Sequence, residues 1–212
     1  MRPPESDDAH YARTRDLLEV PYLEAEDPRG GSGFRGDAER WERARRPIST
    51  AVDRDGTFLD VGCANGLLME SLVGWVRDRG YEIEPYGLDL IDSLAALARE
   101  RLPRWSDRIF AGNVMNWHPP LRFDLACANL EFVPPTRRQA MAERLLREYL
   151  VPHGRLILTS YGSSRRPHPR TEPVAELMRG WGYDIAGEAE ALDTNGVVIT
   201  RVAWTDAPRP FS

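Results

Sequence analysis

The segment FLDVGCANG, residues 58–66, places an acidic side chain, Asp60, at the end of a short apolar run, with two glycines in the turn after it. Apolar side chains then recur at helical spacing from residue 66 to 79, so the sequence predicts a strand, a glycine turn and a helix. Glycines let the backbone approach a ligand closely at the start of a helix. The segment therefore predicts a binding site for a nucleotide-like molecule beyond the strand end.

A second acidic residue, Asp89, ends the next predicted strand at residues 84–89. At that place a carboxylate can accept hydrogen bonds from both hydroxyls of a ribose, although capping of the following helix is an alternative role. The dinucleotide fingerprint GxGxxG is absent, because Cys63, Ala64 and Asn65 follow the first glycine of the turn. The pattern indicates a binding site for a nucleoside. The alternative is a tight turn that binds no ligand.

The rest of the chain alternates short apolar runs with amphipathic ones. Asn-Gly at 195–196 separates two strand-like runs and predicts a closing hairpin. Such an alternation predicts a mostly parallel sheet that is covered on both faces. The expected strands are 57–61, 84–89, 108–111, 123–128, 155–161, 183–189 and 197–204, and the expected helices are 66–79, 93–102, 136–150 and 172–181. Two further helices are expected at 8–19 and 37–53, joined by a Gly-rich connector at 27–36.

Composition narrows the classes of function. All 28 Lys+Arg residues are arginines, which excludes Schiff-base and Walker-lysine chemistry, and a net charge of −5 disfavours nucleic acid as a partner. Two cysteines without CxxC spacing and four scattered histidines indicate no metal site. No apolar run is long enough to span a membrane, so we expect a cytoplasmic protein without a membrane partner. No oligomeric state is indicated.

Four segments in order resemble the S-adenosylmethionine-dependent methyltransferases of the Rossmann-like class. DVGCANG (60–66) resembles the first motif of that family, and Asp89 resembles its ribose-binding acid. FDLACAN (123–129) and LVPHGRLIL (150–158) resemble the fourth strand and the turn into the fifth. The resemblance implies an α/β fold, a Rossmann-like three-layer sandwich whose seven-stranded, mostly parallel sheet ends in an antiparallel hairpin. It also implies an N-terminal helical lid at 1–56 and a cofactor-binding core at 57–212.

By the same resemblance, S-adenosylmethionine is the expected cofactor. Asp60 orders the turn and the methionine ammonium, Asp89 holds the ribose, and Asn113 replaces the acid that many members place at the adenine amino group. The expected cofactor-binding residues are Asp60, Gly62, Cys63, Ala64, Gly66, Asp89, Leu90, Asn113, Val114, Asn129 and Leu130. The last two are expected to face the methionine end and the reactive methyl group.

The sequence gives weaker signals for the residues that would bind the methyl acceptor. Glu131 is the candidate base, with a solvated loop residue as the alternative, and Tyr161 and His153 are weaker candidates. Residues 129–132 resemble the Asn-Pro-Pro-Tyr/Phe motif of amino-directed methyltransferases only in part, since the prolines come later. Arg165, in an Arg-rich loop, is a candidate for binding an anionic group of the acceptor, and Trp41 is a candidate lid residue.

These features predict methyl transfer to a small-molecule acceptor, because no large recognition domain remains outside the core. The alternatives are a non-catalytic nucleoside-binding module, methylation of RNA or protein, and nicotinamide-dependent reduction. The last of these is disfavoured because the third glycine of the GxGxxG fingerprint is missing.

Overall fold

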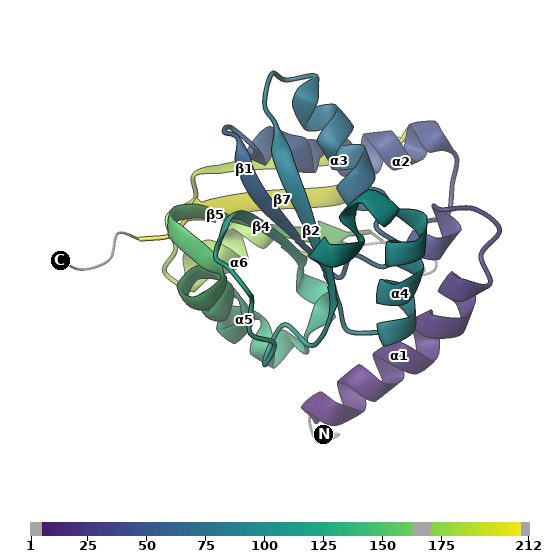
Figure 1. Cartoon of the computed structure of the whole chain (residues 1–212). Coiled ribbons are helices and arrows are strands. Elements are labelled where there is room, and N and C mark those ends of the chain that lie inside the picture. Colours follow the sequence, from purple (N-terminus) through teal and green to yellow (C-terminus); the bar gives the residue numbers. More distant parts are fainter. Residues whose placement is uncertain (1–5, 163–170, 209–212) are drawn as a thin grey trace, which may run out of the picture.

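A single seven-stranded sheet forms the centre of the molecule, with the strand order β3-β2-β1-β4-β5-β7-β6 (Figure 1). The structure is a computed structural model that describes residues 6–162 and 171–208. The strands are β1 (Gly56–Val61), β2 (Ile83–Asp89), β3 (Ile109–Ala111), β4 (Phe123–Asn129), β5 (Leu150–Tyr161), β6 (Gly187–Leu192) and β7 (Val198–Asp206). The first five strands pair in parallel, and β7 is antiparallel to both β5 and β6. The predicted mostly parallel sheet with a final hairpin is confirmed.

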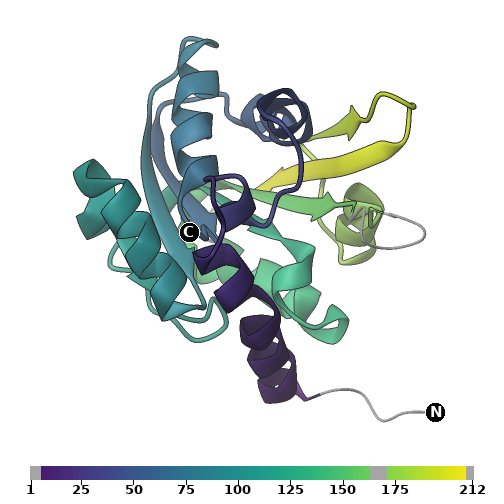
Figure 2. The same ribbon diagram turned by 90° about the vertical axis from the view of Figure 1, so that its right-hand side faces the viewer.

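Helices cover both faces of this sheet (Figure 2). The helices are α1 (Asp7–Leu23), α2 (Ala38–Arg45), α3 (Leu67–Arg77), α4 (Asp92–Arg101), α5 (Arg138–Arg144) and α6 (Val174–Gly180). Met141 of α5 and Met178 of α6 are fully buried in one apolar cluster, whereas Leu72 of α3 and Trp41 of α2 belong to another. This packing confirms the three-layer sandwich. No helix in the described ranges combines the length and the apolar character needed to cross a bilayer.

The N-terminal segment divides into two parts with different packing. The predicted helix at 37–53 is α2 followed by a 3₁₀ helix, η2 (Arg46–Ala51), because Pro47 lacks the amide that would continue the α-helix. Ile48 and Ala51 of η2 are fully buried beside α3. Helix α1 is longer than predicted and lies at the edge of the molecule beside α4 (Figures 1 and 2).

The segment between α5 and β5 also differs from the prediction. Helix α5 passes into a π-helical turn, η6 (Leu145–Tyr149), and β5 begins at Leu150, five residues before the expected strand. The turn expected before the fifth strand, within residues 150–158, is an irregularity within β5, where His153 has a φ of 61° and the register with β4 shifts. The buried Tyr149 hydroxyl donates to the Val114 and Trp117 carbonyls at 2.8 and 2.9 Å, which fixes the end of this helical segment.

Candidate functional site

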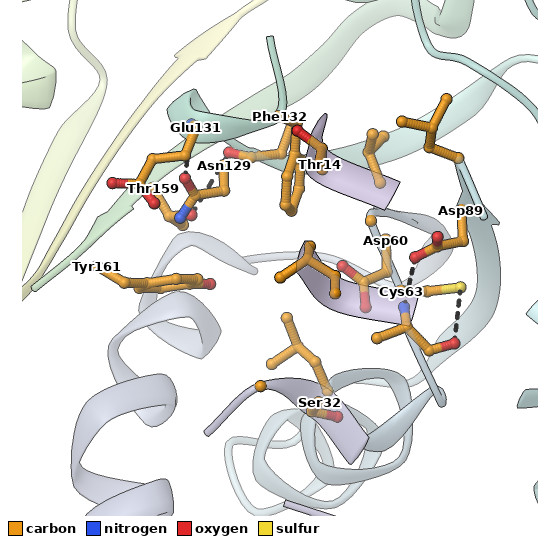
Figure 3. Close-up of a pocket in the computed structure, with 18 of the residues that line it drawn as sticks. Thr14, Ser32, Asp60, Cys63, Asp89, Asn129, Glu131, Phe132, Thr159 and Tyr161 are labelled. Carbon is orange, nitrogen blue, oxygen red and sulfur yellow. Dashed lines mark hydrogen bonds between the residues drawn. The ribbon is translucent and has the colours of Figure 1, made fainter. Parts of the chain in front are cut away.

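A cavity of about 830 Å³ lies at the carboxyl ends of the parallel strands, under α1. Asp60, Asp89 and Asn129, each at the end of a strand, line it from the sheet side (Figure 3). Thr14 and Tyr22 of α1 also line it. Its size and its position at the strand ends suit a nucleotide-sized ligand together with a small second molecule.

The glycine turn after β1 forms one wall of this cavity. Gly62 has a φ of 76°, and a Cβ atom there would lie 2.3 Å from the Phe132 ring, so only glycine fits. Ala64 also adopts a left-handed conformation, with a φ of 47°, and its amide donates to Asp89 Oδ2 at 2.8 Å. The Asp89 carboxylate thus holds the turn in the conformation that opens it toward the cavity.

Asp89 keeps hydrogen-bonding capacity for a ligand. Its Oδ1 accepts from the Ile91 amide at 2.8 Å, and each carboxylate oxygen retains a second lone pair. Burial raises its pKa to about 6, and the bonds from Ile91 and Ala64 partly oppose that rise. The residue that caps α4 is Ile91, with no side-chain cap, so the alternative role of Asp89 as the helix cap is not supported.

Asp60 is a buried carboxylate whose Oδ2 finds no hydrogen-bond partner within the described structure. Its side chain points into the cavity close to Asp89 (Figure 3). Burial and the nearby charge of Asp89 raise its pKa to about 8, against the opposing influence of Arg45. Because a buried carboxylate is destabilising without a partner, this geometry suits a ligand that brings a positive charge.

The predicted adenine side lies over β2 and β3. Leu90, Asn113 and Val114 all line the cavity there. Asn113 Oδ1 accepts from the Met115 amide at 2.9 Å and retains one lone pair. Tyr11 reaches Asn113 from α1, and burial raises the pKa of its phenol while Asn113 partly offsets this. Helix α1 therefore closes this side of the cavity.

Three polar side chains meet on the other side, at the ends of β4 and β5. Glu131, Asn129 and Thr159 lie close together, with the Phe132 ring next to them (Figure 3). Asn129 Oδ1 accepts from the Glu131 amide at 2.8 Å, which fixes the turn after β4. The Glu131 side chain is exposed at the cavity wall. This group is placed to orient a second molecule or to accept a proton from it.

Several predicted residues stand elsewhere or play another part. Leu130 is a correction: its side chain is fully buried in the core and does not line the cavity. Gly66 caps α3 in a left-handed conformation against Leu102 and likewise lies outside the lining. His153 is exposed and does not line the cavity either. Arg165 lies outside the described residues.

Both cysteines line the cavity as free, buried thiols, and burial raises the pKa of each well above its usual range. Trp41 lines the cavity but is mainly a core residue, with its indole donating to Ser71 Oγ at 3.0 Å. Among the described residues, no group of three or more His, Cys, Asp or Glu side chains could hold a metal ion.

Two features of the site were not foreseen from the sequence. The Arg45 guanidinium lies 3.5 Å from the centre of the Tyr161 ring and faces the cavity. Its position four residues after Trp41, on the same face of α2, was the only signal for this. Burial raises the pKa of Tyr161 beyond its ordinary value, so the phenol stays neutral and is unsuited to act as a base.

The second unforeseen feature is a clamp between the glycine turn and the connector after α1. The Asn65 amide donates to the Pro28 carbonyl at 2.7 Å, and its Oδ1 accepts from the Ser32 hydroxyl at 2.6 Å. A Cβ at Gly31 would lie 2.7 Å from the same amide, so a glycine permits this close approach. The connector is therefore attached to the turn that lines the cavity.

The comparisons with known proteins concern the fold. No family model and no curated protein sequence matches the chain. The solved structure of the N-methyltransferase NodS from Bradyrhizobium japonicum WM9, with S-adenosylhomocysteine, is 19% identical, covers 92% of this chain and 99% of its own, and has a TM-score of 0.66. The 1,6-didemethyltoxoflavin-N1-methyltransferase of Burkholderia thailandensis, with its substrate and S-adenosylhomocysteine, is 19% identical over 98% and 93%, with a TM-score of 0.67.

The [4+2]-cyclase SpnF has a comparable likeness, with 15% identity over 98% of this chain and 99% of its own and a TM-score of 0.65. One fold thus carries more than one reaction, so the fold alone does not specify the chemistry. The sheet order, the terminal hairpin and these neighbours together show that the chain has the Rossmann-like fold of the S-adenosylmethionine-dependent methyltransferases.

Proposed function

We propose that this protein transfers a methyl group from S-adenosylmethionine to a small-molecule acceptor. The observation that carries the proposal is the buried Asp60 side chain in the cavity beside Asp89, whose Oδ2 has no hydrogen-bond partner among the described residues. S-adenosylmethionine carries a ribose and two positive groups, an ammonium and a sulfonium. One acid for the ribose and one for a positive charge, set on a glycine turn, match that molecule better than a dinucleotide.

The residues at the ends of β1, β2 and β3 support the binding of this cofactor on their side of the cavity. Asp89 would accept the ribose hydroxyls with its remaining lone pairs, and the backbone at 62–64 would lie along the methionine part. Leu90, Asn113 and Val114 would contact the adenine. Asp60 would face the ammonium. When bound, the cofactor supplies an activated methyl group that needs only an aligned nucleophile.

The chain's own contribution would be orientation and the exclusion of water. Asn129 and Glu131 stand at the wall where the acceptor would lie, and Glu131 would take a proton from a hydroxyl or ammonium acceptor. The neutral Tyr161 would donate a hydrogen bond.

We propose that the movable lid is α1 with its connector, and that α2 and η2 stay with the core. Helix α1 rests on the core partly through polar contacts, including an Arg137–Asp7 ion pair at 2.9 Å and a bond from Ser93 to Glu19 at 2.5 Å. Each surface contact of this kind contributes little to the stability of the packed helix, so α1 can move away from the core at a small cost in free energy. The 1–56 boundary expected from the sequence would thereby move to about residue 37.

Incubation with S-adenosylmethionine and a fractionated cell extract tests this function. We expect S-adenosylhomocysteine to form, and a compound in the small-molecule fraction to gain the mass of one methylene group. Product formation only with the RNA or protein fraction would refute the small-molecule acceptor. Tight binding of S-adenosylhomocysteine without turnover on any fraction would favour the non-catalytic module. The Asp89→Ala variant is the negative control.

A further inference from the structure

The arginines of α2 fall into two groups that differ in pairing. Arg43 and Arg46 form ion pairs with Glu39 and Glu42, one helical turn earlier, and Arg46 also pairs with Asp78 at 3.3 Å. Arg40 and Arg45, which line the cavity, form no ion pair with any acid in the described ranges. The helix thus supplies acids for the arginines outside the cavity and none for those that line it.

Aromatic rings hold Arg45 in place. Its guanidinium carbon lies 3.5 Å from the centre of the Tyr161 ring, and 5.3 Å from those of both Phe34 and Trp41. No hydrogen-bond acceptor for its side chain occurs among the residues that the structure describes. A guanidinium stacked on a ring keeps its N–H edge available, and that edge matches a carboxylate in a bidentate pair. Arg45 is therefore a fixed cation that forms no ion pair with an acid of the described residues, although its charge lowers the pKa of the nearby Asp60.

The surroundings place Arg45 on the side of the cavity away from the expected adenosine site. Tyr161 ends β5, and Phe34 packs beside Ile199 of β7. Asp89 and Asn113 lie at the ends of β2 and β3, which the sheet order separates from β5 by β1 and β4. Arg40 stands over the same Phe34 ring, with its guanidinium carbon 5.7 Å from the ring centre. Two cations and two rings thus share the wall where the acceptor would bind.

We propose that this wall, formed by Phe34, Arg40, Arg45 and Tyr161, binds a planar acceptor that carries a carboxylate. The carboxylate would pair with the N–H edge of Arg45, and the Phe34 and Tyr161 rings would flank the planar part. The reacting group of the acceptor would then point to Asn129 and Glu131. This inference rests on the proposed function, because it names the class of acceptor for the same cavity.

Calorimetric titration with benzoate and benzamide, in the free protein and in the protein saturated with S-adenosylhomocysteine, tests the charge requirement. We expect benzoate to bind one to one, with a dissociation constant in the millimolar range expected for so small a ligand, and at least about tenfold more tightly than benzamide. Arg45→Gln should abolish the preference for the anion. Arg43→Gln, which changes a paired arginine on the same helix, is the matched control and should retain it.

The carboxylate of the cofactor competes with that of the acceptor as the partner of Arg45. A second pair of ligands distinguishes these two carboxylates. S-adenosylhomocysteine has that carboxylate, whereas 5′-methylthioadenosine lacks it. We expect Arg45→Gln to leave the affinity for 5′-methylthioadenosine within about twofold of the parent. Because Arg45 lowers the pKa of Asp60, the affinity for S-adenosylhomocysteine should change by up to about fivefold through the ammonium alone. A larger weakening of S-adenosylhomocysteine binding would assign Arg45 to the cofactor carboxylate and overturn the proposal.

Equal binding of benzoate and benzamide by the parent, or no binding of either, would also overturn it. Failure of the parent to bind S-adenosylhomocysteine is a different result. It would refute the proposed function itself.

Discussion

Binding of the cofactor or its product should release a proton from Asp60. Burial and the charge of Asp89 raise the pKa of Asp60 to about 8, so about nine-tenths of the molecules carry a proton there at pH 7. An ammonium placed against this carboxylate favours its ionised form and lowers its pKa below that pH. Asp89, with a pKa raised to about 6, would add only about one-tenth of a proton. The total release should be about 0.8 to 1 proton per ligand at pH 7.

Calorimetry of S-adenosylhomocysteine binding at pH 7, in buffers that differ in ionisation enthalpy, measures this number directly. The release should fall to about half a proton at pH 8, because half of the Asp60 side chains are already ionised there. In Asp60→Asn the release should nearly vanish, and the ligand should bind more weakly. An equal proton release from the parent and the variant, together with an unchanged affinity for the ligand, would refute the cation role of Asp60.

The remaining predictions concern stability, the ribose, the base and the lid. Since the folded-state pKa of Asp60 is raised, its contribution to stability is present below about pH 4 and is lost as the pH rises toward 8. The melting temperature of the parent should therefore fall from pH 5 to pH 8, and Asp60→Asn should fall less; parallel curves would contradict this. Asp89→Ala should weaken binding of S-adenosylhomocysteine by about 10-fold to 150-fold, and an unchanged affinity would exclude the ribose contact. Once an acceptor is found, Glu131→Gln should lower kcat by about 10²-fold to 10⁴-fold if Glu131 is the base, or mainly raise KM if it only orients. A kcat within about threefold of the parent from pH 6 to 9 would exclude the base role. Ser32→Ala removes one hydrogen bond to Asn65, so without ligand the connector at 28–36 should be cleaved by a protease faster in the variant than in the parent. Bound S-adenosylhomocysteine should slow the cleavage in both proteins. Equal rates in parent and variant, with and without ligand, would exclude a mobile lid.

The sequence predicted the positions of residues best where the order of the strands, or a local turn, already determines which residues lie together. Asp60 and Asp89 end adjacent parallel strands, so a correct strand prediction also places their side chains at the same edge of the sheet. The Asn-Gly pair likewise predicts the terminal hairpin from local turn chemistry.

It was least informative where distant segments decide the outcome. The amphipathic pattern of α2 does not reveal that Arg45 lies on the Tyr161 ring, because that contact joins segments far apart in the chain. Leu130 follows the expected strand, but its turn directs the side chain into the core instead of the cavity. Similarly, nothing local shows that Asn65 holds the connector rather than the ligand.

The affinity of the purified protein for S-adenosylhomocysteine, compared with that for NAD in the same calorimetric experiment, tests the central claim most directly. The paired acids and the glycine turn predict one-to-one binding of S-adenosylhomocysteine and weaker or no binding of NAD. Tighter binding of NAD, or no binding of S-adenosylhomocysteine, would contradict the assignment of this cavity to S-adenosylmethionine.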